Sequence, residues 1–209
     1  AILTLRQDQL GDSHHDTLTT RHELARVLHG QGELQQARSE FEAILTLRQD
    51  QLGDSHHDTL TTRHELARVL HGQGDLRAAG TEFEAVLAVR REQLGEVHPS
   101  TLASRHNLAR VLHSRGDLAR ARSELEAILS AERELRGDTY PGTLDTRHDL
   151  ARVMQDQGEL QAARSEFEAV LALRRERLGA AHPSTLDTQH HLIQMPVAEG
   201  EAGTGAGVG

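Results

Sequence analysis

The apolar residues of the chain recur with helical spacing. When successive positions are placed about 100° apart, one group falls on a single face: Leu18, Leu24, Ala25 and Leu28. A second run, from Leu34 to Leu52, spaces its apolar residues by three, four and seven. No stretch alternates apolar and polar residues as a half-buried strand would. The pattern therefore predicts an all-α protein built from two kinds of helix.

The two helical patterns form a block that repeats. An apolar marker, Ala-Ile-Leu or Ala-Val-Leu, begins at Ala1, Ala43, Ala85, Ala127 and Ala169, so the period is 42 residues. Residues 1–32 and 43–74 are identical. A helix pair of this size buries its apolar face only by stacking on neighbouring pairs. The repeat therefore predicts a linear array of helix pairs.

Glycine and proline mark the ends of the predicted helices. Glycine follows each pattern, where a left-handed residue often ends a helix, and proline stands in the first turn at Pro99, Pro141 and Pro183. The motif HPST at 98–101 and 182–185 therefore indicates a helix start rather than a catalytic His-Ser pair. First-type helices are predicted near 15–29, 57–71, 99–113, 141–155 and 183–194. Second-type helices are predicted near 34–52, 76–94, 118–136 and 160–178.

The chain divides into a repeat array and a tail. Residues 1–194 are predicted to hold about four full helix pairs with a half repeat at each end, since residues 1–10 match the end of a second-type helix. Residues 195–209 are rich in Gly and Ala, which predicts a disordered tail. The half repeats leave apolar surface uncovered, so we expect a longer array or end-to-end self-association.

Composition excludes several classes of protein. The net charge of −9 argues against a nucleic-acid partner, which requires a basic surface. The absence of cysteine excludes disulfides and thiolate metal sites. No apolar run reaches the roughly 20 residues of a membrane span, and the first residues do not read as a signal peptide. We therefore expect a cytoplasmic protein with no membrane association.

One segment carries a family resemblance. ELARVLHGQGELQQARSEFEAIL, from Glu23, resembles the tetratricopeptide repeat, and the matching positions are Leu24, Ala25, Leu28, Gly32, Leu34, Ala37 and Phe41. The 42-residue period and the linker LGEVHPSTL at 94–102 are similar to the variant in kinesin light chains and bacterial signalling proteins. The resemblance implies a right-handed α-solenoid in which the first helices line a concave groove. Arginine and histidine at 21 and 22 depart from the motif, so kinesin cargo specificity does not carry over.

The candidate binding residues form three ladders along the first helices. On the helical wheel, His22, Arg26 and His29 make a polar stripe roughly 130° from the centre of the apolar face. The resemblance implies that this stripe faces the groove. Its members across the repeats are His22, His64, His106 and His148; Arg26, Arg68, Arg110 and Arg152; and His29, His71 and His113. Arginine suits carboxylates, so an acidic protein or peptide is the expected partner.

Other interpretations remain open. Near-identical repeats copy surface residues mechanically, so a ladder by itself does not prove a site. The array could instead be the regulatory region of a larger bacterial signalling protein, or a self-assembling module. An enzyme needs one unrepeated constellation of residues, and none is evident, so no catalytic residue and no cofactor are predicted. Histidines seven residues apart along a helix do not favour a metal site, although a histidine-based pH response stays open.

Arg21 raises a separate question, because it falls inside the apolar face of its helix. An unpaired charge is too costly to bury. We therefore expect its guanidinium to pair with Glu40, with Glu42, or with the equivalent acid of the preceding repeat.

Overall fold

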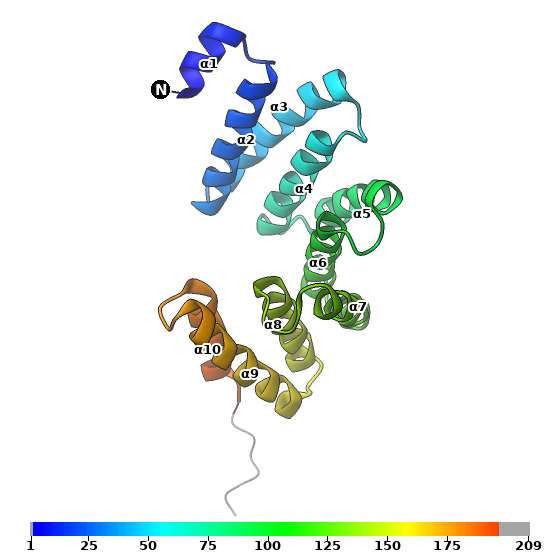
Figure 1. The fold of residues 1–209 in the computed structure, drawn as a ribbon, viewed down its shortest axis with the longest axis vertical. Coiled ribbons are helices and arrows are strands. Elements are labelled where there is room, and N and C mark those ends of the chain that lie inside the picture. The colour runs from blue at the N-terminus through cyan, green and yellow to red at the C-terminus, as the bar shows by residue number, and fades with distance from the viewer. Residues whose placement is uncertain (1, 197–209) are drawn as a thin grey trace, which may run out of the picture. The chain divides into compact units, whose positions relative to one another are not determined.

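A computed structural model describes residues 2–196, which form ten helices arranged as consecutive antiparallel pairs (Figure 1). No strand occurs within these residues, which confirms the predicted all-α class. The chain forms two compact units that divide between Arg115 and Gly116. None of the described helices combines the length and the apolar character that a bilayer crossing requires.

The first unit contains six helices. They are α1 (Ile2–Leu10), α2 (His15–Gly30), α3 (Leu34–Leu52), α4 (His57–Gly72), α5 (Leu76–Leu94) and α6 (Pro99–Ser114). Each helix packs against the next one in sequence, and α4 also contacts both α2 and α6. The first helices of successive pairs therefore form a continuous wall along one side of this unit.

The second unit repeats the same arrangement with four helices. They are α7 (Leu118–Arg136), α8 (Pro141–Asp156), α9 (Leu160–Leu178) and α10 (Pro183–Gln194). Consecutive helices pack against each other, as in the first unit. The predicted helix ends agree with the observed ones to within one residue, because glycine and proline fix them.

Glycine and histidine shape the connections between helices. Gly53, at φ 84°, ends α3, and Gly74, at φ 81°, lies between α4 and α5. Such a φ disfavours any residue with a side chain. His98 precedes Pro99, and its Nδ1 accepts a hydrogen bond from the backbone N–H of Ser100. The HPST motif is thus a helix start, as predicted, although the capping side chain is histidine rather than serine or threonine.

The core follows the 42-residue period. Phe41, Phe83 and Phe167 are fully buried at the centre of their second helices. Met195 is also buried and packs near Phe167, while Arg164 donates to the carbonyl oxygen of Pro196. The array therefore extends two residues into the predicted tail, and the rest of that tail, 197–209, lies outside the described residues.

Candidate functional site

The first histidine ladder is buried, which differs from the expected exposed stripe. His22, His64 and His148 are only 6%, 8% and 4% exposed. Each ring meets the edge of a phenylalanine nineteen residues later at a centroid distance of 5.2 Å: Phe41, Phe83 and Phe167 respectively. A wheel for a single helix does not show this burial, because two neighbours cover a first helix: its own partner helix and the next first helix. The fourth member, His106, is partly buried.

Burial sets the charge state of these histidines. It lowers the pKa of His22 to about 4, and Arg48 adds to the shift. Burial likewise lowers the pKa of His64 to about 3, with Arg90 as the next cause. The pKa of His148 falls to about 4 through burial and then Arg174. All three imidazoles are therefore neutral near pH 7.

The arginines beside these histidines form a buried ladder of their own. Arg48 donates from Nη1 to the backbone carbonyl of Asp58 and to Thr62 Oγ1, at 3.1 and 2.8 Å. Arg90 and Arg174 make the same two bonds with the next first helix, and both also lie 3.4 Å from a histidine Nδ1. Each guanidinium thus ties a second helix to the first helix that follows it.

Sequence reasoning missed this ladder, although a signal was present. An arginine stands at 6, 48, 90 and 174, and a serine or threonine follows fourteen residues later each time. At the equivalent position between 90 and 174, the residue is Glu132 instead of an arginine. Glu132 accepts a hydrogen bond from Thr146 at 2.7 Å. The α7–α8 interface therefore keeps the first-helix hydroxyl, on Thr146, but its second-helix partner is negatively charged instead of positively charged.

The second predicted ladder, of arginines, lies at the surface. Arg26 and Arg110 are exposed, and Arg68 and Arg152 are partly exposed. Arg26 pairs with Glu23 at 3.1 Å, and Arg68 with Glu65 at 2.9 Å. Arg152 pairs with Asp149 in the same way. An acid three residues earlier therefore balances each of these three charges.

The third ladder lies partly buried at the C-terminal ends of the first helices. His71 Nε2 is 2.9 Å from Ser114 Oγ, which is on the next first helix of the same unit. Burial lowers the pKa of His29, and the nearby Arg68 contributes. His113 is also partly buried. His71 thus helps to join α4 to α6.

Arg21 behaves as predicted. It forms an ion pair with Glu40 at 2.9 Å, Arg63 pairs with Glu82 at 2.9 Å, and Arg147 pairs with Glu166. Arg105 instead approaches Glu96 at 3.7 Å. The prediction of a second-helix partner is confirmed for the first three, so this ladder supports the fold.

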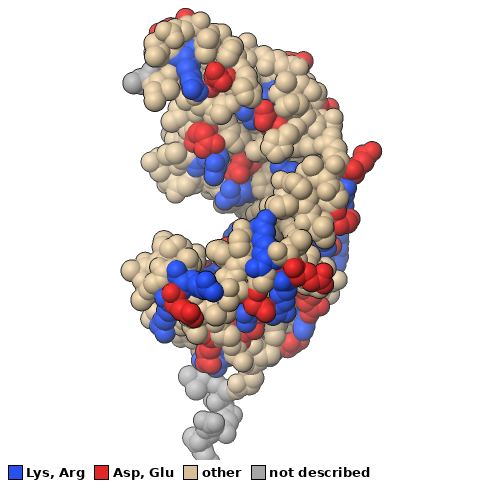
Figure 2. Space-filling model, viewed as in Figure 1, with Lys and Arg blue, Asp and Glu red and all other residues tan. Residues whose placement is uncertain are grey.

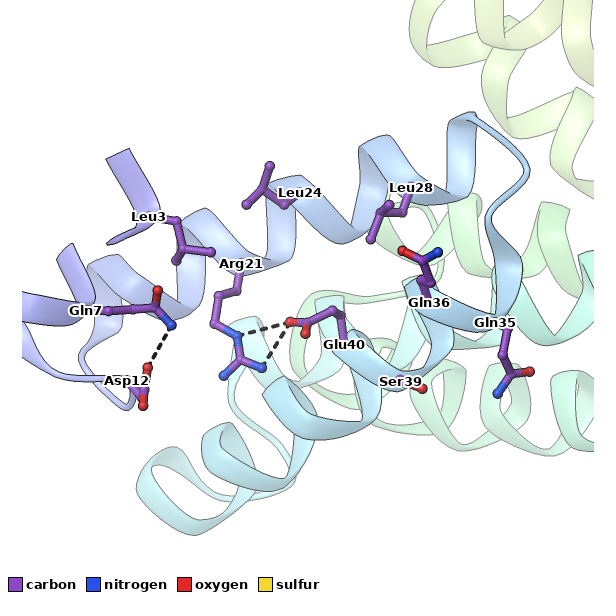
Figure 3. Close-up of a pocket in the computed structure, with 10 residues that line it drawn as sticks. All are labelled: Leu3, Gln7, Asp12, Arg21, Leu24, Leu28, Gln35, Gln36, Ser39 and Glu40. Carbon is purple, nitrogen blue, oxygen red and sulfur yellow. Dashed lines mark hydrogen bonds and ion pairs between the residues drawn. The ribbon is translucent and has the colours of Figure 1, made fainter. Parts of the chain in front are cut away.

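A cavity of about 690 Å³ lies beside the first of these pairs (Figure 3). Leu3, Leu24 and Leu28 line one part of it, and the Arg21–Glu40 pair borders another. Leu24 and Val27 are 45% and 54% exposed, whereas the equivalent Leu66 and Val69 are 6% and 0% exposed. The same repeat positions are therefore buried one repeat later but open here.

Charges of both signs are mixed on the surface. Figure 2 shows arginine and acidic residues side by side over both units. Many of them form ion pairs within one helix, such as Arg38 with Glu42 and Arg122 with Glu126. The face shown carries no large patch of a single sign, so any preference for acidic ligands depends on local arginines.

The repeats match a known family. The tetratricopeptide repeat pattern matches residues 16–80, 58–133 and 111–176. The chain belongs to the tetratricopeptide repeat family, whose members are generally protein-interaction scaffolds without enzymatic activity. No match was found among curated proteins.

Solved structures show the same fold. A Podosopora anserina protein described as putative kinesin light chain nearly identical TPR-like repeats is 34% identical, with a TM-score of 0.69 over 86% of this chain and 85% of that one. A variant of that protein is 33% identical, with the same TM-score over 84% and 82%. BtubC (BKLC) from P. vanneervenii is 18% identical, with a TM-score of 0.70 over 90% and 75%, and supports the fold alone.

Proposed function

We propose that the chain is a protein-binding scaffold that holds an acidic segment against its first helices. The observation that carries this proposal is the arginine that each of α2, α4, α6 and α8 presents at the same position: Arg26, Arg68, Arg110 and Arg152. Within the first unit, α4 contacts both α2 and α6, which supports a row formed by Arg26, Arg68 and Arg110.

The arginines can bind a ligand without losing their own ion pairs. Arg68 uses Nη1 to contact both carboxylate oxygens of Glu65. A guanidinium has five N–H donors in a planar fork, so donors remain for a carboxylate of the ligand. His29, His71 and His113 follow the first three of these arginines by three residues, and His22, His64, His106 and His148 precede the four arginines by four residues.

A fluorescence anisotropy titration tests this proposal. A labelled Glu/Asp-rich peptide should bind more tightly than a Lys-rich peptide of equal length, and higher salt should weaken its binding. Arg26→Ala with Arg68→Ala should weaken the acidic peptide by about tenfold, because two charge-assisted contacts are lost.

The matched control removes the same charge from the second helices. Arg38→Ala with Arg77→Ala should change the affinity by less than about twofold, since both residues lie on α3 and α5. Equal losses from the two double variants, or equal affinity for both peptides, would rule out the proposed row.

A second candidate function is end-to-end self-association through the cavity at α1–α3. In the following repeat, the residues equivalent to Leu24 and Val27 are covered within the chain. A helix of a second copy would bury the same positions. Light scattering should then show a mass that rises with concentration, and Leu24→Ser should abolish that rise. A wild-type mass independent of concentration would exclude this function.

A further inference from the structure

One set of residues in the second unit breaks the repeat. Within the first unit, the residues 39 and 43 positions after a buried histidine are Thr61 and Glu65 for His22, and Ala103 and Asn107 for His64. After His148 they are Asp187 and His191. Asp187 repeats Asp145 of the preceding repeat, whereas a histidine occurs at the His191 position in no other repeat. The other residues at that position are Glu23, Glu65, Asn107 and Asp149.

The three side chains converge between α8 and α10. His148 Nε2 lies 3.2 Å from Asp187 Oδ2, and His191 Nε2 lies 3.9 Å from Asp187 Oδ1. All three ligand atoms lie within 4.8 Å of one another, and no other such group occurs within residues 2–196. Around a tetrahedral Zn²⁺ with bonds of about 2.0–2.1 Å, ligand atoms stand about 3.4 Å apart, so modest side-chain movements would bring the three ligand atoms to zinc-binding distances.

The buried ring points its unpartnered nitrogen at this site. The His148 side chain is 5% exposed, and its Nε2 makes no hydrogen bond. On the other side of the ring, Nδ1 is 3.3 Å from Thr188 Oγ1 and 3.4 Å from Arg174 Nη1. In the absence of a cation, Nδ1 accepts from Arg174 and the ring proton on Nε2 faces Asp187. A cation at Nε2 would shift this proton to Nδ1, which can donate to Thr188 while Arg174 keeps its bonds to Ser184 and Thr188. A hydrogen bond behind the ring fixes many metal-binding histidines in this way.

The local charges permit a cation. Asp187 and Asp149 place negative charge near the rings, and Arg174 and Arg152 oppose it. Arg174 is itself neutralised in part by Asp145.

We propose that His148, Asp187 and His191 bind one Zn²⁺ ion that cross-links α8 to α10. Two imidazole nitrogens and a carboxylate oxygen are a common protein ligand set for zinc, with a fourth position left for water or for another side chain. Asp187 is exposed and His191 only partly buried, so the ion has a path from solvent.

Isothermal titration of the untagged chain with Zn²⁺ tests the site. The wild type should show one tight binding event and a rise in melting temperature, because an ion that binds only the folded chain stabilises it. Asp187→Ala and His191→Asn should each weaken this event by at least about tenfold. Their substitutes are the residues at equivalent positions of the first unit, Ala103 and Asn107, which the same helix packing accommodates.

The neighbouring His190 supplies the control. It is exposed and lies outside the triad, so His190→Asn should leave the tight event within about twofold of wild type. Circular dichroism confirms that each variant is folded. The proposal is overturned if the wild type binds Zn²⁺ no more tightly than His191→Asn, or if His190→Asn loses as much affinity.

Discussion

His64 in the first unit and His148 in the second have the same three neighbours, a phenylalanine, an arginine and a hydroxyl, which we call the frame of the histidine. Each ring stands edge-on to a phenylalanine at 5.2 Å, with an arginine at 3.4 Å and a hydroxyl at 3.3 Å from Nδ1. The Nε2 sides differ, because His64 faces Asn107 at 3.4 Å whereas His148 faces Asp187 at 3.2 Å. The repeat thus fixes one side of the ring, and chemistry can diverge on the other.

The largest expected effect comes from removing the shared arginine. Arg90→Ala and Arg174→Ala should each lower the free energy of unfolding by about 3 kcal/mol, since a buried carbonyl, a hydroxyl and a histidine lose their common donor. Urea denaturation measures the change. A loss below about 1 kcal/mol at either position would show that the frame does not depend on its arginine.

Acid should weaken the structure by a somewhat smaller amount for each buried histidine, although the losses of the three histidines add. The unfolded histidines titrate near 6.5, but His22 and His148 titrate near 4 and His64 near 3 when folded, which is the pKa shift that burial imposes. Between these values the unfolded chain binds more protons, so stability is complete above about pH 6.5 and falls as the pH drops. Each histidine contributes a slope of about 1.4 kcal/mol per pH unit, which urea denaturation from pH 7 to pH 4.5 measures.

His64→Asn is the control for this pH dependence. Asparagine keeps a hydrogen-bond acceptor for Arg90 but does not titrate. The slope of unfolding free energy against pH should decrease by about 1.4 kcal/mol per pH unit. Arg90 should keep a hydrogen-bond acceptor at this position. An unchanged slope would mean that His64 is not buried in the neutral form.

A smaller effect is expected from the hydroxyls that receive the arginines. Ser104→Ala and Thr188→Ala should each cost about 1–2 kcal/mol, because Arg90 or Arg174 loses one acceptor but keeps a backbone carbonyl. Thermal unfolding followed by circular dichroism measures both. A much larger cost at only one position would show that the two frames are not equivalent.

The smallest effect is expected at the surface arginines. Arg68→Ala and Arg152→Ala each remove an ion pair within one helix, and exposed pairs of this kind contribute under about 1 kcal/mol. Urea denaturation should therefore show almost wild-type stability. This outcome also allows loss of peptide binding by Arg68→Ala to be attributed to the row itself.

The sequence predicted the helices well but the burial of polar residues poorly. Helix ends depend on local residues such as Gly53 and Pro99, whose preferences act without distant partners. Burial of His64 depends on Phe83 and on the first helix of the next pair, which a wheel for one helix cannot represent.

The proposed metal triad was missed for a related reason. Histidine spacings were compared along one helix. His148 and His191 lie on successive first helices, at different repeat positions. Only the packing of α10 on the α8–α9 pair brings them together.

The arginine joints also bear on how the array comes apart. In a linear array, the strength of each interface determines how far unfolding spreads from one module to the next. Three interfaces share a hydrogen bond from a second-helix arginine to a hydroxyl of the next first helix, made by Arg48, Arg90 and Arg174. At the α7–α8 interface, Glu132 instead accepts a single hydrogen bond from Thr146. We therefore expect opening that begins in α7 to stop before α8 if this single acceptor holds the interface less firmly than an arginine does.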